Sequence, residues 1–543
     1  MVCNSEIRNP QSAINSNVRA RERFRFSEAD LQQMNTCEIS EAQVRAQIEL
    51  FRKSSFSIRL RRPCSLGDGI RRIDAAEGER YLEFHRRAAQ KGRFLKFVPA
   101  SGAATRMLQS LLQIVHLPQY LEPNELHGKA KYGVAVACDF LQFLDRIQRF
   151  AFCEDLEEAL ARDGLNLGAL IRAHQYRTLL DYLLTDIGLN YGSLPKGLLK
   201  FHCYPDGCRT AFEEHMEEAV LYVADAEGVC RIHFTVSPEH EDGFRQLLER
   251  VRPRYENRYG VTYEVTFSYQ KPSTHTIAAD TRNRPFRDRF GRFVFRPGGH
   301  GALLENLENT QGDLVYIKNV DNVIQDRFKD TLGFWKRVLG GYLAAIEEVV
   351  HEHVRELKAA KSSDSIGRAE TFAREKVLVQ FPTTYEAWAL EEKHAFLLDK
   401  MDRPIRVCGV VQNVGEPGGA PFWVEDRSGD LSLQIVEKAQ VDFASPEQQE
   451  IWNSSTHFNP VDLVCSVRNY EGKPFTLKDY VDHDAVFISK KSMEGRSLKA
   501  LELPGLWNGA MAGWLTLIVE VPRITFNPVK TVFDLLKPEH QPG

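Results

Sequence analysis

The stretch Phe97-Val-Pro-Ala-Ser-Gly-Ala-Ala-Thr-Arg-Met107 joins a short apolar run to five small residues, a Thr-Arg pair and a run of helix-forming residues. This order predicts a buried strand over Phe94–Val98, a tight loop, and a helix over Leu108–Val115. Small residues expose backbone N–H groups, and a helix N-terminus favours anions. Arg106 adds a bidentate phosphate donor. The stretch therefore predicts a phosphate-binding loop, with a plain strand–helix packing turn as the alternative.

Composition restricts the class of protein. The chain has 543 residues, 43% of them apolar, and a net charge of −4. A strongly basic nucleic-acid footprint is absent from this composition. No apolar run reaches the ~18 residues of a membrane span, and the polar first residues do not read as a signal peptide. We therefore expect a cytoplasmic protein without a nucleic-acid or membrane partner, while the oligomeric state stays open.

The ten cysteines are scattered and form no C-x-x-C pair. Their closest arrangement is Cys203 with Cys208, and no further cysteine pair accompanies it, which argues against a zinc site. We therefore expect reduced thiols.

Strand-like runs at 232–236, 261–267 and 314–317 alternate with helical patterns at 211–224 and 243–251. Such alternation is typical of an α/β fold with a largely parallel sheet. The expected segments are a helical N-terminal extension (1–90), an α/β domain (91–361) with a helical insertion (about 108–194), a linker and helix (362–402), and a β-rich C-terminal region (403–543). The best linker candidate is Ser362-Ser-Asp-Ser-Ile-Gly367.

Two further segments carry charges that suit a phosphate ligand. Lys196 follows Pro195 ahead of an apolar run, where it could reach a phosphate from the sheet edge; a solvated lysine is the alternative. Asp321 follows the strand-like run Leu314–Ile317 at the expected carboxyl edge of the sheet, where ligands bind in such folds. With phosphate oxygens it would suit Mg²⁺, whereas an Asx-turn cap would need no ligand.

Two glycine- or proline-containing segments complete the set. Pro297-Gly-Gly-His-Gly301 allows close backbone approach, so a base or sugar could lie against it, with a simple turn as the alternative. The segment Phe526-Asn-Pro-Val-Lys530 alone reads as an ordinary strand–loop–helix connection.

Taken in this order, these segments resemble the UTP-dependent sugar-1-phosphate uridylyltransferases, the UDP-glucose and UDP-N-acetylhexosamine pyrophosphorylases. The matching elements are the loop ending Thr-Arg-Met107, Pro195-Lys196, Pro297–Gly301, Asp321-Asn322 and Phe526-x-Pro-Val-Lys530, with Gln270 where the family reads the uracil. Ala302 departs from the Asp that the UDP-glucose enzymes carry after Gly-His-Gly. The whole chain is also similar to a bacterial family described as a domain of unknown function.

The resemblance implies a nucleotide-diphospho-sugar transferase (GT-A, Rossmann-like) fold. It also implies transfer of a nucleotidyl group from a nucleoside triphosphate, with UTP expected, to a sugar 1-phosphate, releasing pyrophosphate. Segment 91–361 would then be catalytic, and the C-terminal region would return Lys530 to the site. The implied roles are catalysis by Arg106, Lys196 and Lys530; nucleotide binding by Ala100, Ser101, Gly102, Ala103, Ala104, Thr105, Gln270, Gly298 and Gly299; sugar-phosphate binding by His300 and Asn322; and Mg²⁺ binding by Asp321, with Asp462 or Asp482 as a second carboxylate.

A rival reading is a non-catalytic nucleotide or nucleotide-sugar binding protein on the same fold, which the alanines of the loop favour. Phosphoryl transfer of the kinase type is a third possibility, although the chain has no G-x-x-x-x-G-K-[ST] loop. Release of pyrophosphate rather than ADP would separate these readings.

Overall fold

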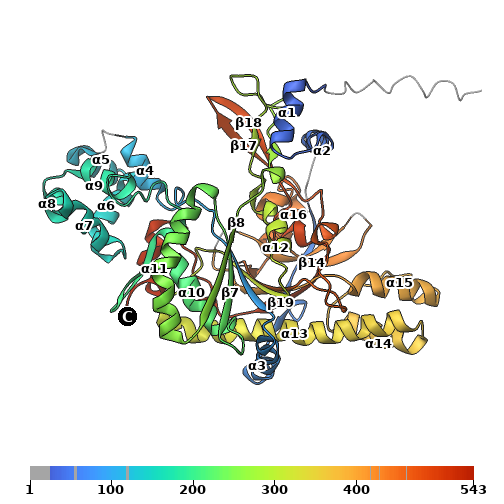
Figure 1. Cartoon of the computed structure of the whole chain (residues 1–543). Coiled ribbons are helices and arrows are strands. Elements are labelled where there is room, and N and C mark those ends of the chain that lie inside the picture. Colours follow the sequence, from blue (N-terminus) through green and yellow to red (C-terminus); the bar gives the residue numbers. More distant parts are fainter. Residues whose placement is uncertain (1–24, 54–57, 118–120, 416–417, 427, 460) are drawn as a thin grey trace, which may run out of the picture.

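A central sheet of ten strands crosses the molecule (Figure 1). Its strands are β2 (Ser65–Leu66), β3 (Gly69–Arg72), β4 (Phe94–Pro99), β7 (Val229–Thr235), β8 (Thr262–Ser268), β11 (Leu314–Lys318), β12 (Ile405–Gln412), β15 (His457–Phe458), β16 (Asp462–Ser466) and β19 (Leu515–Glu520). Their order is β2-β3-β19-β12-β16-β11-β4-β7-β8, with β15 beside β12. Strand β16 pairs antiparallel with β11 and β12, and β15 pairs antiparallel with β12. The other pairs of neighbouring strands are parallel. The predicted α/β fold with a largely parallel sheet is confirmed.

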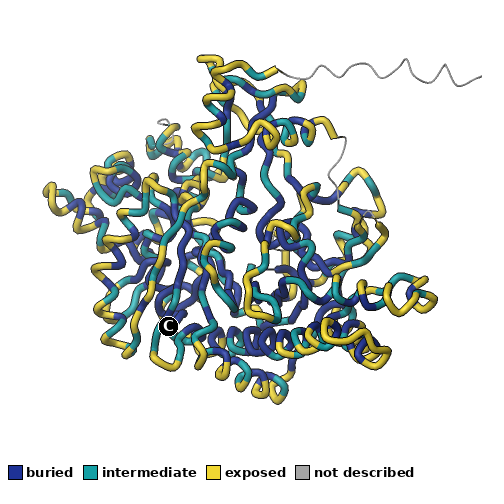
Figure 2. The backbone as a smooth tube through the Cα atoms, turned by 45° about the vertical axis from the view of Figure 1, so that its right-hand side comes forward, coloured by how far each residue is buried: buried dark blue, intermediate teal, exposed yellow. Residues whose placement is uncertain are grey.

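The sheet separates two hydrophobic cores, because successive side chains of a strand point to opposite faces. Along β11, Leu314 and Tyr316 enter one core, whereas Val315 and Ile317 enter the other. The first core is closed by α3 (Ala75–Gln90), α10 (Ala211–Tyr222), α11 (Glu241–Tyr259) and α13 (Lys329–Ala359), and the second by α12 (Leu303–Asn309) and the loop that carries Trp507 and Trp514. Buried residues gather in the strands and the helices that cover them (Figure 2).

A group of short helices follows β4 and lies to one side of the sheet (Figure 1). It consists of α4 (Gln109–Val115), α5 (Pro123–Lys131), α6 (Ala135–Arg146), α7 (Cys153–Arg162), α8 (Leu167–Arg172) and α9 (Tyr176–Leu184). Their apolar side chains join the first core. The helical character predicted for this part of the chain is therefore present.

Two smaller units lie outside the central sheet. An arm above the sheet in Figure 1 contains α1 (Glu28–Thr36), α2 (Glu41–Arg52), β9 (Thr276–Ile277), β10 (Phe295–Arg296) and β18 (Arg496–Glu502), which share a small core. Strand β17 (Phe487–Met493) pairs with β18 in the same arm. A separate sheet joins β1 (Arg59–Pro63), β13 (Ala420–Glu425) and β14 (Leu431–Val436), with α16 (Pro446–Asn453) nearby.

Two expectations for secondary structure need correction, and the expected β-rich C-terminal region is confirmed. Residues 1–90 are expected to form a helical extension, but their described part also contains β1, β2 and β3. Residues 1–24 and 54–57 of this extension lie outside the described residues. The linker predicted at 362–367 is wrong, because Ser362 caps α14 (Ser363–Glu375) through its side chain; α15 (Leu390–Met401) follows. The β-rich region beyond 403 supplies β12, β16 and β19 to the central sheet, so strands from both ends of the chain pair within it.

The prediction of reduced thiols is wrong for Cys203 and Cys208, which form a disulfide. They lie opposite each other in a hairpin of β5 (Lys200–Tyr204) and β6 (Gly207–Thr210), and the tight turn brings their Cα atoms to 4.0 Å.

This computed structural model describes residues 25–53, 58–117, 121–415, 418–426, 428–459 and 461–543. Within these residues, no helix is both long and apolar enough to cross a membrane.

A buried ion cluster lies between the sheet and α10. The carboxylate of Glu218 on α10 accepts hydrogen bonds from Lys318 Nζ on β11 at 2.8 and 2.9 Å and from Lys96 Nζ on β4 at 3.1 Å. All three side chains are at most 1% exposed. Burial would raise the pKa of Glu218, but the two lysines hold it well below its usual range. The cluster therefore fixes α10 against two central strands.

Replacing Glu218 by Gln should destabilise the protein by about 3–5 kcal/mol, because two buried ammonium groups lose their counter-charge. Urea unfolding would measure this change. Glu83→Gln is the matched control, since Glu83 pairs with Arg86 at the surface, and exposed pairs contribute less than about 1 kcal/mol. Equal effects in the two variants would contradict the role given to the cluster.

Acid should destabilise the fold through buried histidines such as His85, whose Nε2 donates to Tyr222 O at 3.0 Å and whose ring stacks on Phe94. Burial lowers the pKa of His85 to about 4 from its ordinary 6.5. The unfolded chain therefore binds the proton first, and this stability is lost as pH falls from 6.5 towards 4. Between pH 7 and pH 5 the loss attributable to His85 is about 2 kcal/mol.

Urea unfolding of the wild type and His85→Asn at both pH values would test this, because the variant should lose correspondingly less stability on acidification. An identical pH dependence in both proteins would contradict it.

Candidate active site

The loop after β4 is held from two sides. Ala100 N donates to Thr235 O at 2.8 Å, and Ala104 N donates to Leu194 O at 3.2 Å. Ala104 is buried, so its side chain anchors the loop and its N–H is already paired. Gly102 O accepts from Lys196 N at 3.2 Å, which places the loop alongside the segment that carries Lys196.

The tip of this loop is open. Gly102, Ala103 and Thr105 are exposed, and Ser101 is half-buried. Among the described residues, the N–H groups of Gly102 and Ala103 have no acceptor. A Cβ added at Gly102 would meet nothing within 4 Å, so packing does not require this glycine. The loop therefore presents unpaired backbone donors, as an anion site needs.

An acidic side chain lies between two lysines at the carboxyl edge of the sheet. Lys196 Nζ is 2.7 Å from Asp321 Oδ2, and Lys530 Nζ is 3.1 Å from the same oxygen. Asp321 and Lys196 are 7% and 8% exposed, whereas about half of the Lys530 side chain is exposed. Three of the predicted site residues thus come together from distant parts of the sequence, with only Lys530 reaching well into solvent.

Backbone hydrogen bonds hold the C-terminal segment against the end of β11. Val529 N donates to Asp321 O at 2.9 Å, and Val529 O accepts from Lys196 Nζ at 2.6 Å. Asn527 N donates to Asn322 Oδ1 at 2.9 Å. The other amide atom of Asn322, Nδ2, is buried without an acceptor among the described residues. Asn322 therefore both positions the segment and retains an unused donor.

The charges at this site influence one another. Burial would raise the pKa of Asp321, but Lys530 and Lys196 hold it below its ordinary value. The pKa of Lys196 is lowered, first by burial and then by repulsion from Lys530 and Arg106, although Asp321 opposes this. Arg106 is exposed and makes no direct contact with these groups among the described residues, but it adds to the positive potential there.

The donor set does not fit a Mg²⁺ ion held by the protein. The Asp321 carboxylate already forms ion pairs with the ammonium groups of Lys196 and Lys530. The described ranges contain no cluster of three His, Cys, Asp or Glu side chains suited to a metal. Asp462, one predicted second ligand, is buried in an ion pair with Lys336, and Asp482, the other, is exposed and accepts from Asp484 N. Neither carboxylate is in contact with Asp321.

The predicted base- and sugar-binding segment forms a second group. Gln270 Nε2 donates to Gly299 O at 3.2 Å, so these two predicted residues meet. Added Cβ atoms would lie 2.5 Å from Thr274 O at Gly298 and 2.2 Å from Pro504 O at Gly301. Close packing against neighbouring backbone therefore accounts for these glycines without a ligand.

The His300 ring is held in place by contacts with neighbouring residues. Its ring stacks on Trp507 with centroids 4.1 Å apart, and its Nδ1 accepts from Leu506 N at 3.0 Å. Burial lowers the pKa of His300 to about 4, so the ring is neutral near pH 7. Among the described residues, His300 makes no hydrogen bond to Asp321, Lys196 or Lys530.

Sequence reasoning missed a second polar cluster near the site. His202 bridges Glu214 and His540, with its Nδ1 2.9 Å from Glu214 Oε1 and its Nε2 2.8 Å from His540 Nδ1. All three are buried. No local motif connects residues 202, 214 and 540, so only the folded chain reveals the cluster.

Comparison with known proteins gives one family and a set of loose structural likenesses. The family model "Domain of unknown function (DUF4301)" matches residues 27–541. No curated protein matches the chain.

The solved structures similar to this chain include two enzymes from Trypanosoma brucei. Its uridine diphosphate N-acetylglucosamine pyrophosphorylase is 14% identical, over 94% of this chain and 82% of that one, with a TM-score of 0.45. Its UDP-glucose phosphorylase is 13% identical, over 94% and 80%, with a TM-score of 0.42.

The UDP-glucose pyrophosphorylase from Leishmania major is 14% identical, over 94% and 80%, with a TM-score of 0.43. The predicted membership of a domain-of-unknown-function family is confirmed, since the family model covers nearly the whole chain. The chain belongs to the DUF4301 family.

Proposed function

We propose that this protein transfers a nucleotidyl group from a nucleoside triphosphate, with UTP as the first candidate, to a sugar 1-phosphate and releases pyrophosphate. The observation that carries the proposal is the Lys196–Asp321–Lys530 contact beside a loop with unpaired N–H groups. Arg106 adds a third cation nearby. Such an arrangement suits a ligand with several negative charges.

In the proposed reaction, an oxygen of the sugar phosphate attacks the α-phosphorus in line. The bond from the α-phosphorus to the bridging oxygen of the β-phosphate breaks, and pyrophosphate leaves with that electron pair. No protein nucleophile takes part, so catalysis depends on positioning and charge stabilisation.

The residues divide into those that touch substrate and those that position others. Gly102 and Ala103 would donate N–H groups to phosphate oxygens, and Arg106 and Lys530 would stabilise the transferring phosphates from solvent-exposed positions. Lys196 is buried and bonded to Asp321 and Val529 O, so we assign it to holding the Lys530 segment in place. Asn322 has a buried amide donor for the sugar phosphate.

We assign binding of the nucleotide base to Gln270, Gly298 and Gly299. His300 is proposed to border the sugar phosphate. Gln270 already bonds Gly299, so an entering base would compete for its amide. Packing alone explains Gly298 and Gly301, so these glycines do not distinguish an enzyme from a non-catalytic binder. A binder on this fold would keep nucleotide affinity without releasing pyrophosphate.

A substrate panel tests the proposal. Purified protein with each nucleoside triphosphate, Mg²⁺ in the buffer and a set of sugar 1-phosphates would be scored for pyrophosphate, with nucleotide binding measured by calorimetry. Pyrophosphate release that requires both substrates would support the enzyme. Nucleotide binding without release across the panel would support the non-catalytic binder instead.

Lys530→Ala and Asp321→Asn should each lower kcat/KM for pyrophosphate release by about 100-fold, the effect expected from losing one charge-stabilising group. Lys473→Ala is the matched control, because Lys473 is a surface lysine paired with Glu471 far from the site. Thermal unfolding would verify that all three variants fold. Full activity in both site variants would refute the assigned roles.

A further inference from the structure

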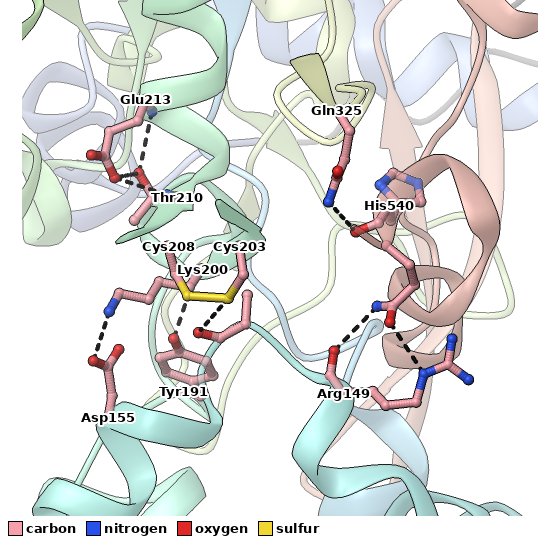
Figure 3. Close-up of a disulfide and its surroundings, with 12 residues drawn as sticks. Arg149, Asp155, Tyr191, Lys200, Cys203, Cys208, Thr210, Glu213, Gln325 and His540 are labelled. Carbon is pink, nitrogen blue, oxygen red and sulfur yellow. Dashed lines mark hydrogen bonds and ion pairs between the residues drawn. A yellow bond between two sulfur atoms is a disulfide. The ribbon is translucent and has the colours of Figure 1, made fainter. Parts of the chain in front are cut away.

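The disulfide lies where solvent can reach it. Cys203 and Cys208 are both partly exposed, and residues 205–207 of the intervening turn are exposed. Figure 3 shows the bridge beside Lys200, Asp155 and Tyr191, with Gln325 and His540 on the far side. Lys200 Nζ is 2.6 Å from Asp155 Oδ1, so the hairpin also contacts the helices that follow β4.

The other described cysteines are reduced. They are Cys37, Cys64, Cys138, Cys153, Cys230, Cys408 and Cys465, and five of the seven are buried. Buried thiols are protected from oxidation and from thiol exchange, whereas an exposed disulfide is open to attack by a thiolate. An exposed disulfide is more labile than a buried structural bridge, and this property suits a redox-responsive site.

The residues next to the two cysteines make polar contacts, and His202 belongs to the buried cluster of His202, Glu214 and His540. His202, beside Cys203, contacts Glu214 and His540. Tyr204, on the other side of Cys203, donates to Glu214 Oε1 at 2.7 Å. Arg209, beside Cys208, lies 2.8 Å from Asp326 Oδ1. The conformation of the hairpin therefore determines where the buried side chains of His202 and Arg209 and the half-buried side chain of Tyr204 lie.

The hairpin also joins the two lysine-bearing segments. The turn over Lys196–Leu198 directly precedes β5. His540 lies ten residues after Lys530 on the C-terminal segment, and its carbonyl accepts from Gln325 Nε2 at 3.0 Å. A cavity of about 360 Å³ is bordered by Asn527, Pro528 and His540 of this segment.

We propose that Cys203–Cys208 is a reversible thiol–disulfide site, and that its reduction by a dithiol loosens the β5–β6 hairpin and releases the C-terminal segment through His202 and His540. The effect on activity rests on the function proposed above, because Lys530 is on the released segment. The oxidised form holds Lys530 against Asp321 and is the active form.

The exchange balances without a cofactor. One thiolate of the dithiol attacks a sulfur of the bridge, and the other cysteine leaves as a thiolate and takes up a proton. The second thiolate of the dithiol then displaces the first cysteine from the mixed disulfide. The dithiol is oxidised by two electrons to its own disulfide, and Cys203 and Cys208 become thiols.

The test uses the full-length protein with dithiothreitol as the dithiol. Thiol titration under denaturing conditions should find two more thiols after reduction, ten in all. Hydrogen exchange of residues 526–541 should become faster on reduction, and pyrophosphate release should fall by about tenfold, the scale expected when a catalytic group is misplaced. The double variant Cys203→Ser, Cys208→Ser should show the hydrogen exchange and the pyrophosphate release of the reduced wild type. Dithiothreitol should change neither quantity in this variant.

Cys153→Ser is the matched control, since Cys153 is a buried free thiol in the neighbouring α7 and should leave the response intact. Ten titratable thiols before reduction would overturn the proposal, as would unchanged exchange at 526–541 once the bridge is reduced. Faster exchange in a protein that shows no pyrophosphate release would support the redox site and count against the proposed function alone.

Discussion

The Asp321 carboxylate is the contact on which the arrangement of the site depends. It joins two ammonium groups whose residues lie 334 positions apart, Lys196 and Lys530, at the end of a central strand. Without Asp321, two lysines would repel each other at a largely buried position. The carboxylate therefore makes it possible for the last segment of the chain to lie against the sheet edge, with one cation buried and the other exposed.

The parts of the fold that sequence analysis predicted correctly are those with local signals. The five small residues after Phe97 and the apolar run before them fixed a strand and a loop, and both are present. The strand ending near Asp321 was readable for the same reason. The meeting of Lys196, Asp321 and Lys530 followed from a resemblance across separate motifs, since no local pattern connects them.

The parts that were missed depend on contacts between distant residues. The strands β1 to β3 have two to five residues each, too few for a periodic pattern, and they form because distant strands such as β13 and β19 pair with them. Gly301 is explained only by Pro504 O. The disulfide did have a local signal, the turn Pro205-Asp206-Gly207 between its cysteines, which composition-based reasoning about the whole chain overrode.

The order of strands in the central sheet also has a consequence for synthesis of the chain. Strand β19 pairs with β3 on one side and with β12 on the other. Ile70 of β3 therefore has no strand partner on this side until Ile518 of β19 has been synthesised. Contacts this far apart in sequence form slowly and leave strand edges unpaired in the meantime. A nascent chain that still lacks residues 515–543 exposes the edges of both β3 and β12. The interval before β19 joins the sheet is therefore the one in which these two strand edges are most open to association with other chains.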